Sequence, residues 1–354
     1  MRKKAISLFS SIGIAEYYLK DIGIDIVLAN EIDRKRVEAY KNIYPDTEII
    51  SGDITQKEIR KQIIDYVKGS KIDLLIATPP CQGVSLAGMN KKIVDYLKDP
   101  RNFLILEAIK IFDEINPDYF IIENVPRFKN MLFPIENKYV NLQELLERKY
   151  SNEYNISVEE LNAATFGVPQ TRMRIVYRLW RKGLLWNVTK EDKVVTLSEA
   201  IGHLPSLESG EVSGIKNHFA RIHPENHIAA MRSTPSGKGA FENEFNYPKK
   251  ENGERIKGYN NTYKRMSWNK PAPTVTMRNE AISSQENVHP GRALENGLWS
   301  DARVLTLREL LIISSLPADM EIPTNLNERQ FRLLIGEGIP PLMMKNILKG
   351  ITSE

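Results

Sequence analysis

Cys81 is the residue of this sequence best suited to nucleophilic chemistry. It is the only cysteine among 354 residues, and it directly follows Pro79 and Pro80. Two prolines fix φ and remove two backbone donors, so the loop is stiff. The apolar run 74–77 before them predicts a buried strand, which places the thiol at the carboxyl end of a sheet, where open α/β sheets bind ligands. A lone cysteine is often a core residue, but the rigid turn and the polar stretch after it favour a nucleophile.

The elements that must position Cys81 alternate along the first half of the chain. Apolar runs predict strands at 5–9, 24–29, 48–51, 74–77 and 119–122, and helical patterns predict helices at 14–20, 34–42 and 102–115. This alternation is typical of an α/β fold with a parallel sheet and right-handed crossovers. Polar residues follow the strands, so five of them are expected to meet at one edge: Ser10, Glu31, Asp53, Cys81 and Glu123.

Two of these acidic residues indicate a nucleoside ligand. Glu31 ends the second predicted strand, the usual position for a carboxylate that binds ribose hydroxyls. No Gly-x-Gly-x-x-Gly follows the first strand, so a diphosphate cradle is not predicted. A nucleoside without a diphosphate fits better, and S-adenosylmethionine is a common one. The alternative for Glu31 and Asp53 is helix N-capping.

The composition limits the class of protein and the kinds of site that this sequence can form. Hydrophobic residues make up 42% and charged residues 27%, as in an ordinary globular protein. One cysteine excludes an internal disulfide and a multi-thiolate metal site, which favours the cytoplasm. His223 and His227 are spaced like metal ligands, but Pro224 separates them and no suitable carboxylate follows, so no metal is predicted. Neither a signal peptide nor a membrane span is predicted.

Positive charge is concentrated in one segment. Residues 171–300 contain 20 Lys and Arg against 13 Asp and Glu, and aromatic residues lie among them. Such a segment suits phosphate neutralisation with base contacts, although an ordinary solvated surface has the same charge signature.

Several motifs together resemble the bacterial DNA (cytosine-5) methyltransferases along nearly the whole chain. They occur in the family's order: Leu8-Phe9-Ser10 with Gly13, Glu31, Asp53-Ile54, Pro79-Pro80-Cys81-Gln82, Asp99-Pro100-Arg101-Asn102, Glu123-Asn124-Val125, Gln170-Thr171-Arg172-Met173-Arg174, and the late motif from Arg303 to Glu309. The resemblance implies an α/β, Rossmann-like S-adenosylmethionine-dependent methyltransferase sheet with a second, smaller target-recognition domain.

The same resemblance assigns the site. The implied catalytic residues are Cys81, Glu123, Arg172 and Arg174. The implied cofactor-binding residues are Phe9, Ser10, Ser11, Ile12, Gly13, Glu31, Ile32, Asp53, Ile54, Pro79, Leu104 and Glu337. Other interpretations of these patterns stay open: Glu123 as a helix cap, Arg172 and Arg174 as a solvent-facing stripe, and Glu309 as a helix-start ion pair with Arg308.

Four positions depart from the family pattern. Ser7 replaces the usual Asp, Ser11 and Ile14 replace Gly, and Glu337 stands in a Gly-Glu-Gly-Ile-Pro run where the family has Gly-Asn-x-Val-Pro. All four positions belong to the motifs that the resemblance assigns to cofactor binding. Glu337 would repel a methionine carboxylate or pair with its ammonium, and the sequence leaves both open.

The chemistry requires these residue types. Cytosine C5 is a weak nucleophile, so a thiolate from Cys81 must first add to C6. Glu123 would neutralise charge at N3, and Arg174 with Arg172 would stabilise O2. The base must be flipped out of the duplex.

We therefore predict three segments: a catalytic and cofactor-binding domain at 1–180, a target-recognition domain at 181–270, and a return to the catalytic domain at 271–354. The predicted function is S-adenosylmethionine-dependent methylation of duplex DNA by a monomer in the bacterial cytoplasm, in association with the nucleoid, paired with a cognate restriction endonuclease. Alternatives are an RNA (tRNA) cytosine-5 methyltransferase and a non-catalytic DNA-binding regulator.

Overall fold

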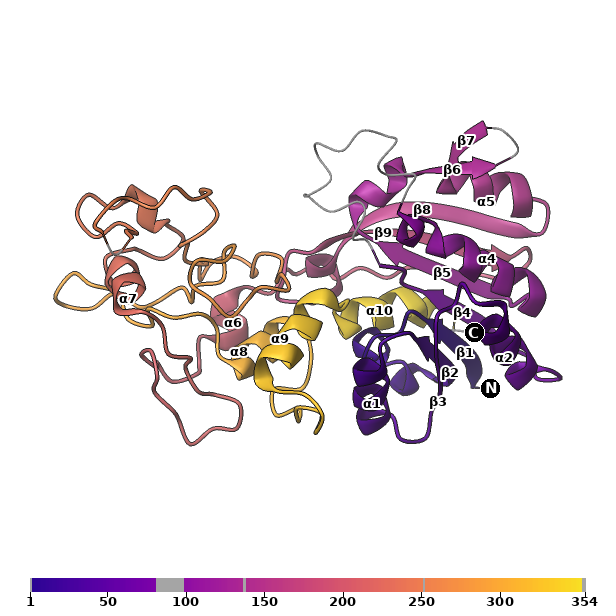
Figure 1. Cartoon of the computed structure of the whole chain (residues 1–354), viewed down its shortest axis with the longest axis horizontal. Helices are drawn as coiled ribbons and strands as arrows, with labels where there is room; N and C mark the ends of the chain where they lie inside the picture. Colours follow the sequence, from indigo (N-terminus) through magenta and orange to yellow (C-terminus); the bar gives the residue numbers. More distant parts are fainter. Residues whose placement is uncertain (1, 81–98, 136–137, 251, 352–354) are drawn as a thin grey trace. The chain divides into compact units, whose positions relative to one another are not determined.

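The computed structural model describes residues 2–80, 99–135, 138–250 and 252–351. Cys81, the predicted nucleophile, lies outside these ranges. The chain forms two compact units (Figure 1). Unit 1 comprises Met1–Asn162, Met173–Thr189 and Met344–Glu354, and unit 2 comprises Ala163–Arg172 and Lys190–Met343.

Unit 1 is built on a seven-stranded sheet with the order β3-β2-β1-β4-β5-β9-β8. The first five strands in this order are parallel, whereas β9 is antiparallel to β5 and β8 is antiparallel to β9. The strands are β1 (Lys3–Leu8), β2 (Ile24–Glu31), β3 (Glu48–Ser51), β4 (Leu74–Ala77), β5 (Tyr119–Asn124), β8 (Tyr154–Asn162) and β9 (Met173–Arg181). The predicted α/β fold with a mostly parallel sheet is confirmed.

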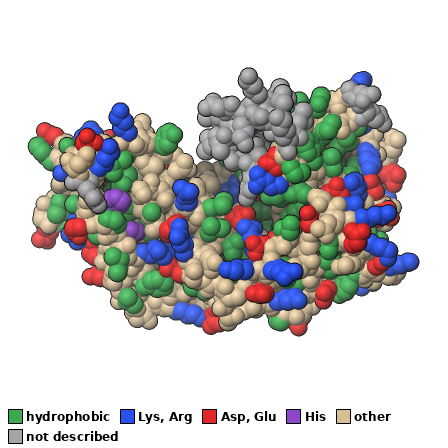
Figure 2. Space-filling view, in the orientation of Figure 1, with side chains coloured by type: hydrophobic (Ala, Val, Ile, Leu, Met, Phe, Trp, Pro, Cys, Tyr) green, Lys and Arg blue, Asp and Glu red, His purple; other side chains and the backbone are tan. Residues whose placement is uncertain are grey.

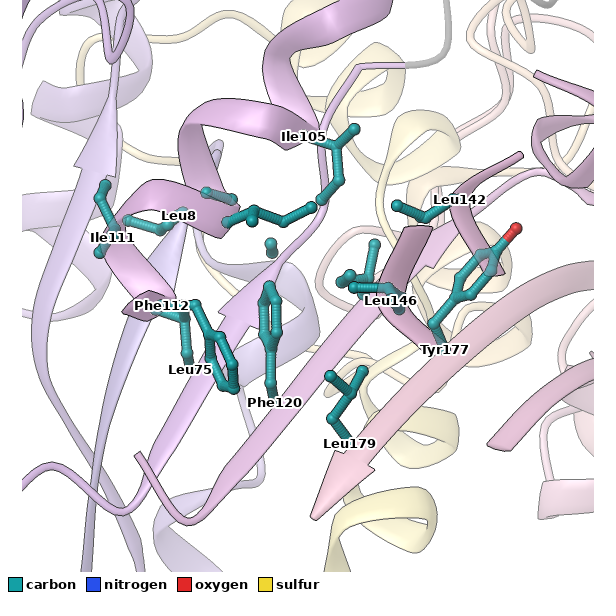
Figure 3. Close-up of a cluster of buried hydrophobic side chains, with 14 of the residues drawn as sticks. Leu8, Leu75, Ile105, Ile111, Phe112, Phe120, Leu142, Leu146, Tyr177 and Leu179 are labelled. Carbon is teal, nitrogen blue, oxygen red and sulfur yellow. The ribbon is translucent and has the colours of Figure 1, made fainter. Parts of the chain in front are cut away.

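Helices cover both faces of this sheet. They are α1 (Arg34–Ile43), α2 (Lys57–Val67), α4 (Leu104–Ile115) and α5 (Leu142–Tyr150), with a hairpin of β6 (Leu132–Ile135) and β7 (Lys138–Asn141) before α5. Successive strand residues point to opposite faces. Leu28 accordingly belongs to the large cluster that also contains side chains of α2, α4 and α5, while its neighbour Ala29 packs with Val37 and Tyr40 of α1. Figure 3 shows the larger cluster, in which Phe112 of α4 stacks on Phe120 of β5 with ring centroids 4.6 Å apart.

The helix predicted at 14–20 is wrong. This segment forms two 3-10 turns, η1 (Ile14–Glu16) and η2 (Lys20–Ile22), flanked by Gly13 and Gly23, both left-handed with φ of 78°. Hydrogen bonds to the third preceding residue, such as Leu19 N–H to the Glu16 carbonyl at 2.9 Å, replace the α-helical pattern. The tighter turn carries Glu16 into the protein interior.

Unit 2 contains little regular structure. Its helices are α6 (Leu197–Ile201), α7 (Glu225–Arg232), α8 (Leu307–Ile313) and α9 (Glu328–Glu337), and α10 (Pro341–Leu348) begins in it. Within the described residues, the short 3-10 turns outside 14–22 are η4 (Pro100–Phe103), η5 (Pro126–Asn130), η6 (Ala163–Phe166), η7 (Ala240–Glu242) and η8 (Lys349–Ile351). No helix in the described ranges is long and apolar enough to cross a membrane.

The division between the units differs from the predicted domain limits. Residues 271–343 form one compact unit with 190–270, and the functional division in which 271–354 returns to the catalytic domain stays a prediction. Buried Arg265 shows the physical reason, because it donates to the carbonyls of His289, Ser300 and Asp301 at 2.8 to 3.1 Å. Ser206 likewise donates to the Asp301 carboxylate at 2.6 Å. These long-range bonds between the two segments are invisible in the sequence.

Candidate functional site

The predicted polar residues lie at the carboxyl ends of adjacent parallel strands. Leu8, the last residue of β1, is in register with Asn30 of β2 and with Ala77 of β4, and Ala77 is in register with Ile122 of β5. The residues that follow these positions therefore emerge at one edge, where such sheets bind ligands. Ser10, Glu31, Asp53 and Glu123 occupy this edge.

The loop after β1, residues 9–13, has an unusual backbone. Phe9, Ser11 and Gly13 have φ angles of 59°, 51° and 78°, the left-handed region that disfavours side chains other than glycine. Ser10 N–H donates to the Asn30 carbonyl at 3.0 Å, and Thr78 Oγ donates to the Phe9 carbonyl at 3.2 Å. The loop is thus tied to β2 on one side and to the end of β4 on the other.

Glu31 holds this loop through its carboxylate. Its two oxygens accept hydrogen bonds from Ser11 N–H at 3.0 Å and Asp33 N–H at 2.8 Å. Burial raises the pKa of Glu31, and these backbone donors and Arg36 offset it only in part. The N-cap of α1 is Asp33, which accepts from the N–H groups of Lys35 and Arg36, so Glu31 is not the capping residue. The carboxylate faces the loop and retains acceptor capacity for a ligand hydroxyl.

The other predicted cofactor residues on this side differ in exposure. Ile32 is 62% exposed, whereas Ile12 and Ile54 are buried in the interior. Asp53 is half-buried and accepts from Thr55 N–H at 2.9 Å in a local turn, and the N-cap position of α2 is Gln56. Asp53 therefore does not cap that helix. An exposed apolar side chain beside a carboxylate is suited to a flat ring next to a ribose.

The chain leading to Cys81 is fixed at its start. The Asn124 amide donates to the Pro79 carbonyl at 2.9 Å, and its oxygen accepts from Val125 N–H at 2.9 Å. Both Asn124 and Pro79 are buried. The end of β5 thereby holds the residue two positions before Cys81. Sequence reasoning gave Asn124 no such role, although its place between Glu123 and Val125 in the acidic motif was the available signal.

Glu123 and Arg174 form a buried ion pair on neighbouring strands. Arg174 Nε lies 2.6 Å from Glu123 Oε1, and the side chains are only 10% and 9% exposed. Glu123 is the penultimate residue of β5, and Arg174 lies near the start of antiparallel β9. Their burial rules out a solvent-facing arginine stripe. The pair places an acid and a strong hydrogen-bond donor at the same edge of the sheet.

Arg172 has different surroundings. It belongs to unit 2, is buried, and donates to the backbone carbonyls of Val275, Gly336 and Glu337 at 2.8 to 3.0 Å. These contacts give it a structural function at the end of α9, and its predicted catalytic role stays a prediction. The predicted cofactor residue Glu337 is the last residue of α9, while Leu104 begins α4 and packs partly against the core of unit 1.

In the late motif, the structure corrects the expectation that Glu309 forms a helix-start ion pair with Arg308. Glu309 pairs with Arg303, at 2.8 Å from Nη1, and not with its neighbour Arg308, whose guanidinium donates to the Lys216 carbonyl. Glu309 is also the acidic member of a capping box with Thr306. It is a buried structural residue.

His223 and His227, the pair with metal-ligand spacing, make hydrogen bonds within the protein. His223 Nε2 accepts from Val304 N–H at 3.3 Å, and burial lowers the pKa of His223 to about 4. His227 Nε2 lies 3.0 Å from the Tyr263 hydroxyl. Across the residues that the structure describes, no group of three His, Cys, Asp or Glu side chains is arranged to hold a metal ion.

Comparison with known proteins identifies the class. The family model described as C-5 cytosine-specific DNA methylase matches residues 3–353. The chain belongs to the C-5 cytosine-specific DNA methylase family. This DNA (cytosine-5) methyltransferase is 46% identical over 349 residues to the Type II methyltransferase M1.HgaI of Avibacterium volantium, covering 99% of this chain and 98% of that protein. Family membership selects an enzyme over the non-catalytic regulator.

More distant relatives extend the comparison. The methyltransferase is 29% identical to the Type II methyltransferase M1.HphI of Haemophilus parahaemolyticus, over 98% of this chain and 86% of that protein. It is 26% identical to a tRNA (cytosine(38)-C(5))-methyltransferase of Spodoptera frugiperda, over 99% of each chain. The crystal structure of a proposed DNA modification methyltransferase from an E. coli prophage has a TM-score of 0.70 at 20% identity, covering 99% of this chain and 98% of that one. That likeness shows the fold.

Proposed function

We propose that this methyltransferase transfers a methyl group to C5 of a cytosine in a specific duplex DNA sequence, as the modification enzyme of a restriction-modification system. The observation that carries the proposal is the buried Glu123–Arg174 pair beside the Asn124–Pro79 bond that leads to Cys81. An acid, a cationic donor and a thiol-bearing loop meet the needs of cytosine activation. The names of M1.HgaI and M1.HphI support the biological setting.

The chain's residues divide the chemistry among them. The Cys81 thiolate adds to C6 of a flipped-out cytosine, and the ring electrons move toward N3 and O2. Glu123 shares a proton with N3, and Arg174 stabilises the charge at O2, with Arg172 assigned the same task by the family resemblance. With a sulfonium donor bound, C5 would bond to its methyl group while the S–CH3 bond breaks and leaves a thioether; a base would then take up the C5 proton, and Cys81 would leave as the thiolate.

S-adenosylmethionine is the proposed methyl donor, and it supplies an electrophilic methyl group on a sulfonium. The residues at the sheet edge fit this molecule: Glu31 and Asp53 offer carboxylates to the ribose, and exposed Ile32 offers an apolar surface to the adenine. The loop after β1 lacks the glycine pattern of a diphosphate cradle, which is compatible with a cofactor that has no diphosphate.

Duplex DNA is the proposed substrate, a cognate endonuclease acting on the same site is the proposed partner, and the bacterial cytoplasm is the proposed location. The basic excess of residues 171–300 supports nucleic-acid binding. On the face displayed in Figure 2, Lys and Arg are interspersed with Asp and Glu. Because a tRNA methyltransferase aligns over 99% of both chains, RNA is the second candidate substrate.

The test uses tritiated S-adenosylmethionine with separate pools of duplex DNA and tRNA. Wild-type protein should label cytosine C5 in DNA, Cys81→Ser should abolish labelling, and the exposed control Lys61→Ala should behave as wild type. A duplex containing 5-fluorocytosine should give a denaturation-resistant complex with the wild type and with Lys61→Ala but not with Cys81→Ser, because fluorine blocks the proton loss that releases Cys81. Label in tRNA alone would move the substrate to RNA, and unchanged activity of Cys81→Ser would refute the mechanism.

A further inference from the structure

A buried carboxyl group lies beneath the loop of residues 9–13, and the proposed reaction does not use it. Glu16, in the turn that follows the loop, is 4% exposed. It accepts a hydrogen bond from the Tyr40 hydroxyl of α1 at 2.6 Å and another from the Ser7 hydroxyl of β1. Burying a carboxyl group is costly unless its partners compensate. Glu16 therefore invites a functional explanation.

The tyrosines that surround Glu16 support the loop directly. The Tyr44 hydroxyl donates to the Gly13 carbonyl at 2.6 Å, and the Tyr40 and Tyr44 rings lie 4.8 Å apart. A Cβ added at Gly13 would lie 2.3 Å from the Tyr44 ring and 2.9 Å from the Tyr40 ring. The rings thus press against the glycine backbone, and the same carbonyl also accepts Glu16 N–H at 3.1 Å.

The loop needs such support because its backbone is strained. Phe9 and Ser11 adopt the left-handed region, where a side chain other than that of glycine is sterically strained. On its other side the loop is held by Glu31 through Ser11 N–H. Loss of support from the tyrosine side would let the backbone relax and would move Ser11 away from Glu31.

We propose that Glu16 is a positioning residue for cofactor binding, which anchors Tyr40 so that the Tyr40–Tyr44 pair holds residues 9–13 in their left-handed conformation. This inference rests on the proposed use of S-adenosylmethionine at this edge. Glu16 acts through Tyr40 and Tyr44 and touches no reacting atom. It should affect cofactor affinity and leave the chemical step at saturating cofactor unchanged.

The ionisation of Glu16 predicts a pH dependence of cofactor affinity, which tests this role. Burial raises the pKa of Glu16 to about 7, although the hydrogen bonds from Ser7 and Tyr40 lower it. Tyr44 also interacts with this cluster, and burial raises the pKa of Tyr44 well above its usual value, so it is neutral near pH 7. Ionisation of Glu16 would place a charge at a buried site. The conformation in which residues 9–13 are supported is therefore more stable when Glu16 is neutral. Cofactor affinity should fall as pH rises through 7.

The experiment measures S-adenosylmethionine binding by calorimetry with the full chain and no DNA. Tyr40→Phe should raise Kd about tenfold and change kcat less than twofold. The matched control is Tyr150→Phe, which also deletes a tyrosine hydroxyl bonded to a carboxylate, that of Asp113 at 2.7 Å, and should leave Kd unchanged. Glu16→Gln keeps the shape of the side chain and cannot ionise, so it tests whether the pH dependence of cofactor affinity comes from Glu16.

Between pH 6 and pH 8 the wild-type Kd should rise by up to about tenfold more than that of Glu16→Gln, since one pKa unit corresponds to a factor of ten. The cofactor's own amino group titrates equally in both proteins, so the ratio isolates Glu16. Equal pH profiles, or Tyr40→Phe with unchanged Kd, would overturn the inference. If the wild type binds no S-adenosylmethionine, the proposed cofactor fails. Hydrogen exchange of the residue 9–13 amides then decides the positioning role, because only Tyr40→Phe should accelerate it.

Discussion

Arg303 is the residue of unit 2 whose loss has the most clearly defined cost. Its guanidinium is fully buried and donates to Asp301 at 2.8 Å, to both oxygens of Glu309 at 2.8 and 3.0 Å, and to the Leu207 carbonyl at 2.7 Å. Asp301 and Glu309 are equally buried. Arg303→Met would therefore keep the volume of the side chain and leave two carboxylates without their shared cation.

Two estimates of the magnitude agree. Removing one partner from a buried ion pair costs about 3–5 kcal/mol. Burial alone would raise the pKa of Glu309, but the Arg303 charge, the nearby His289 and the hydrogen bonds from Arg303 and Thr306 together outweigh burial and lower it from 4.5 to about 2. A shift of that size corresponds to roughly 3 kcal/mol of stability at neutral pH. We expect Arg303→Met to lower the free energy of unfolding of unit 2 by about 3–5 kcal/mol at pH 7.

The pH dependence tests the electrostatic reasoning. A carboxylate whose pKa is lowered by folding contributes stability above its unfolded pKa, near 4.5, and loses it as pH falls toward 2. In Arg303→Met, burial without the cation raises the pKa of both carboxyl groups, so they take up protons at higher pH than in the unfolded chain. The difference between wild type and variant should therefore narrow from pH 7 to pH 4. In the wild type, His289, whose pKa burial lowers to about 3, stays neutral over this range.

The assay is hydrogen exchange in increasing urea, followed in peptides that cover 285–313. This readout is needed because the chain has two compact units, and a single unfolding midpoint would average them. Arg308→Met is the matched control, since Arg308 donates to one carbonyl at the surface and should cost less than about 1 kcal/mol. Equal losses in the two variants, or a loss for Arg303→Met that is the same at pH 4 and pH 7, would refute the reasoning.

Three further predictions concern the site. Gly13→Ala should weaken S-adenosylmethionine binding at least tenfold in calorimetry, because its Cβ would lie 2.3 Å from the Tyr44 ring at a φ of 78°. Glu123→Gln should slow tritium transfer to DNA by about 10²–10⁴-fold with little change in cofactor Kd, because the amide cannot share a proton with N3. Arg172→Met should destabilise unit 2 by about 2–4 kcal/mol in urea, since three carbonyl acceptors lose their buried donor.

Each has a contrary outcome. Wild-type affinity in Gly13→Ala would show that the loop is free to move away from Tyr44. Full activity of Glu123→Gln would remove the acid from the mechanism. A stable Arg172→Met that binds cofactor normally but transfers no methyl group would show that Arg172 acts in catalysis rather than as an anchor for the α9 carbonyls.

Local sequence patterns were sufficient for the parallel sheet and for its functional edge. Strands at 24–29, 48–51, 74–77 and 119–122 were predicted within two residues, because buried parallel strands are short apolar runs that need no distant information. The positions of Glu31 and Glu123 follow, because a residue at the carboxyl end of a parallel strand lies at the carboxyl edge of the sheet. The segment 14–20 failed because its helical spacing concealed a buried Glu16, whose partner Tyr40 is 24 residues away.

By itself the sequence determined the order of the strands along the chain, the polar residues at their ends and the family, because these depend on residue type and on neighbours a few positions apart. Only the tertiary structure decided that Arg174 pairs with Glu123 while Arg172 holds the end of α9, and that Arg303, not Arg308, neutralises Glu309. It likewise decided that 271–343 folds with 190–270. The physical reason is that two arginines in one motif have the same chemistry. The carboxylate or carbonyl that each one contacts is positioned by segments that are distant in the sequence.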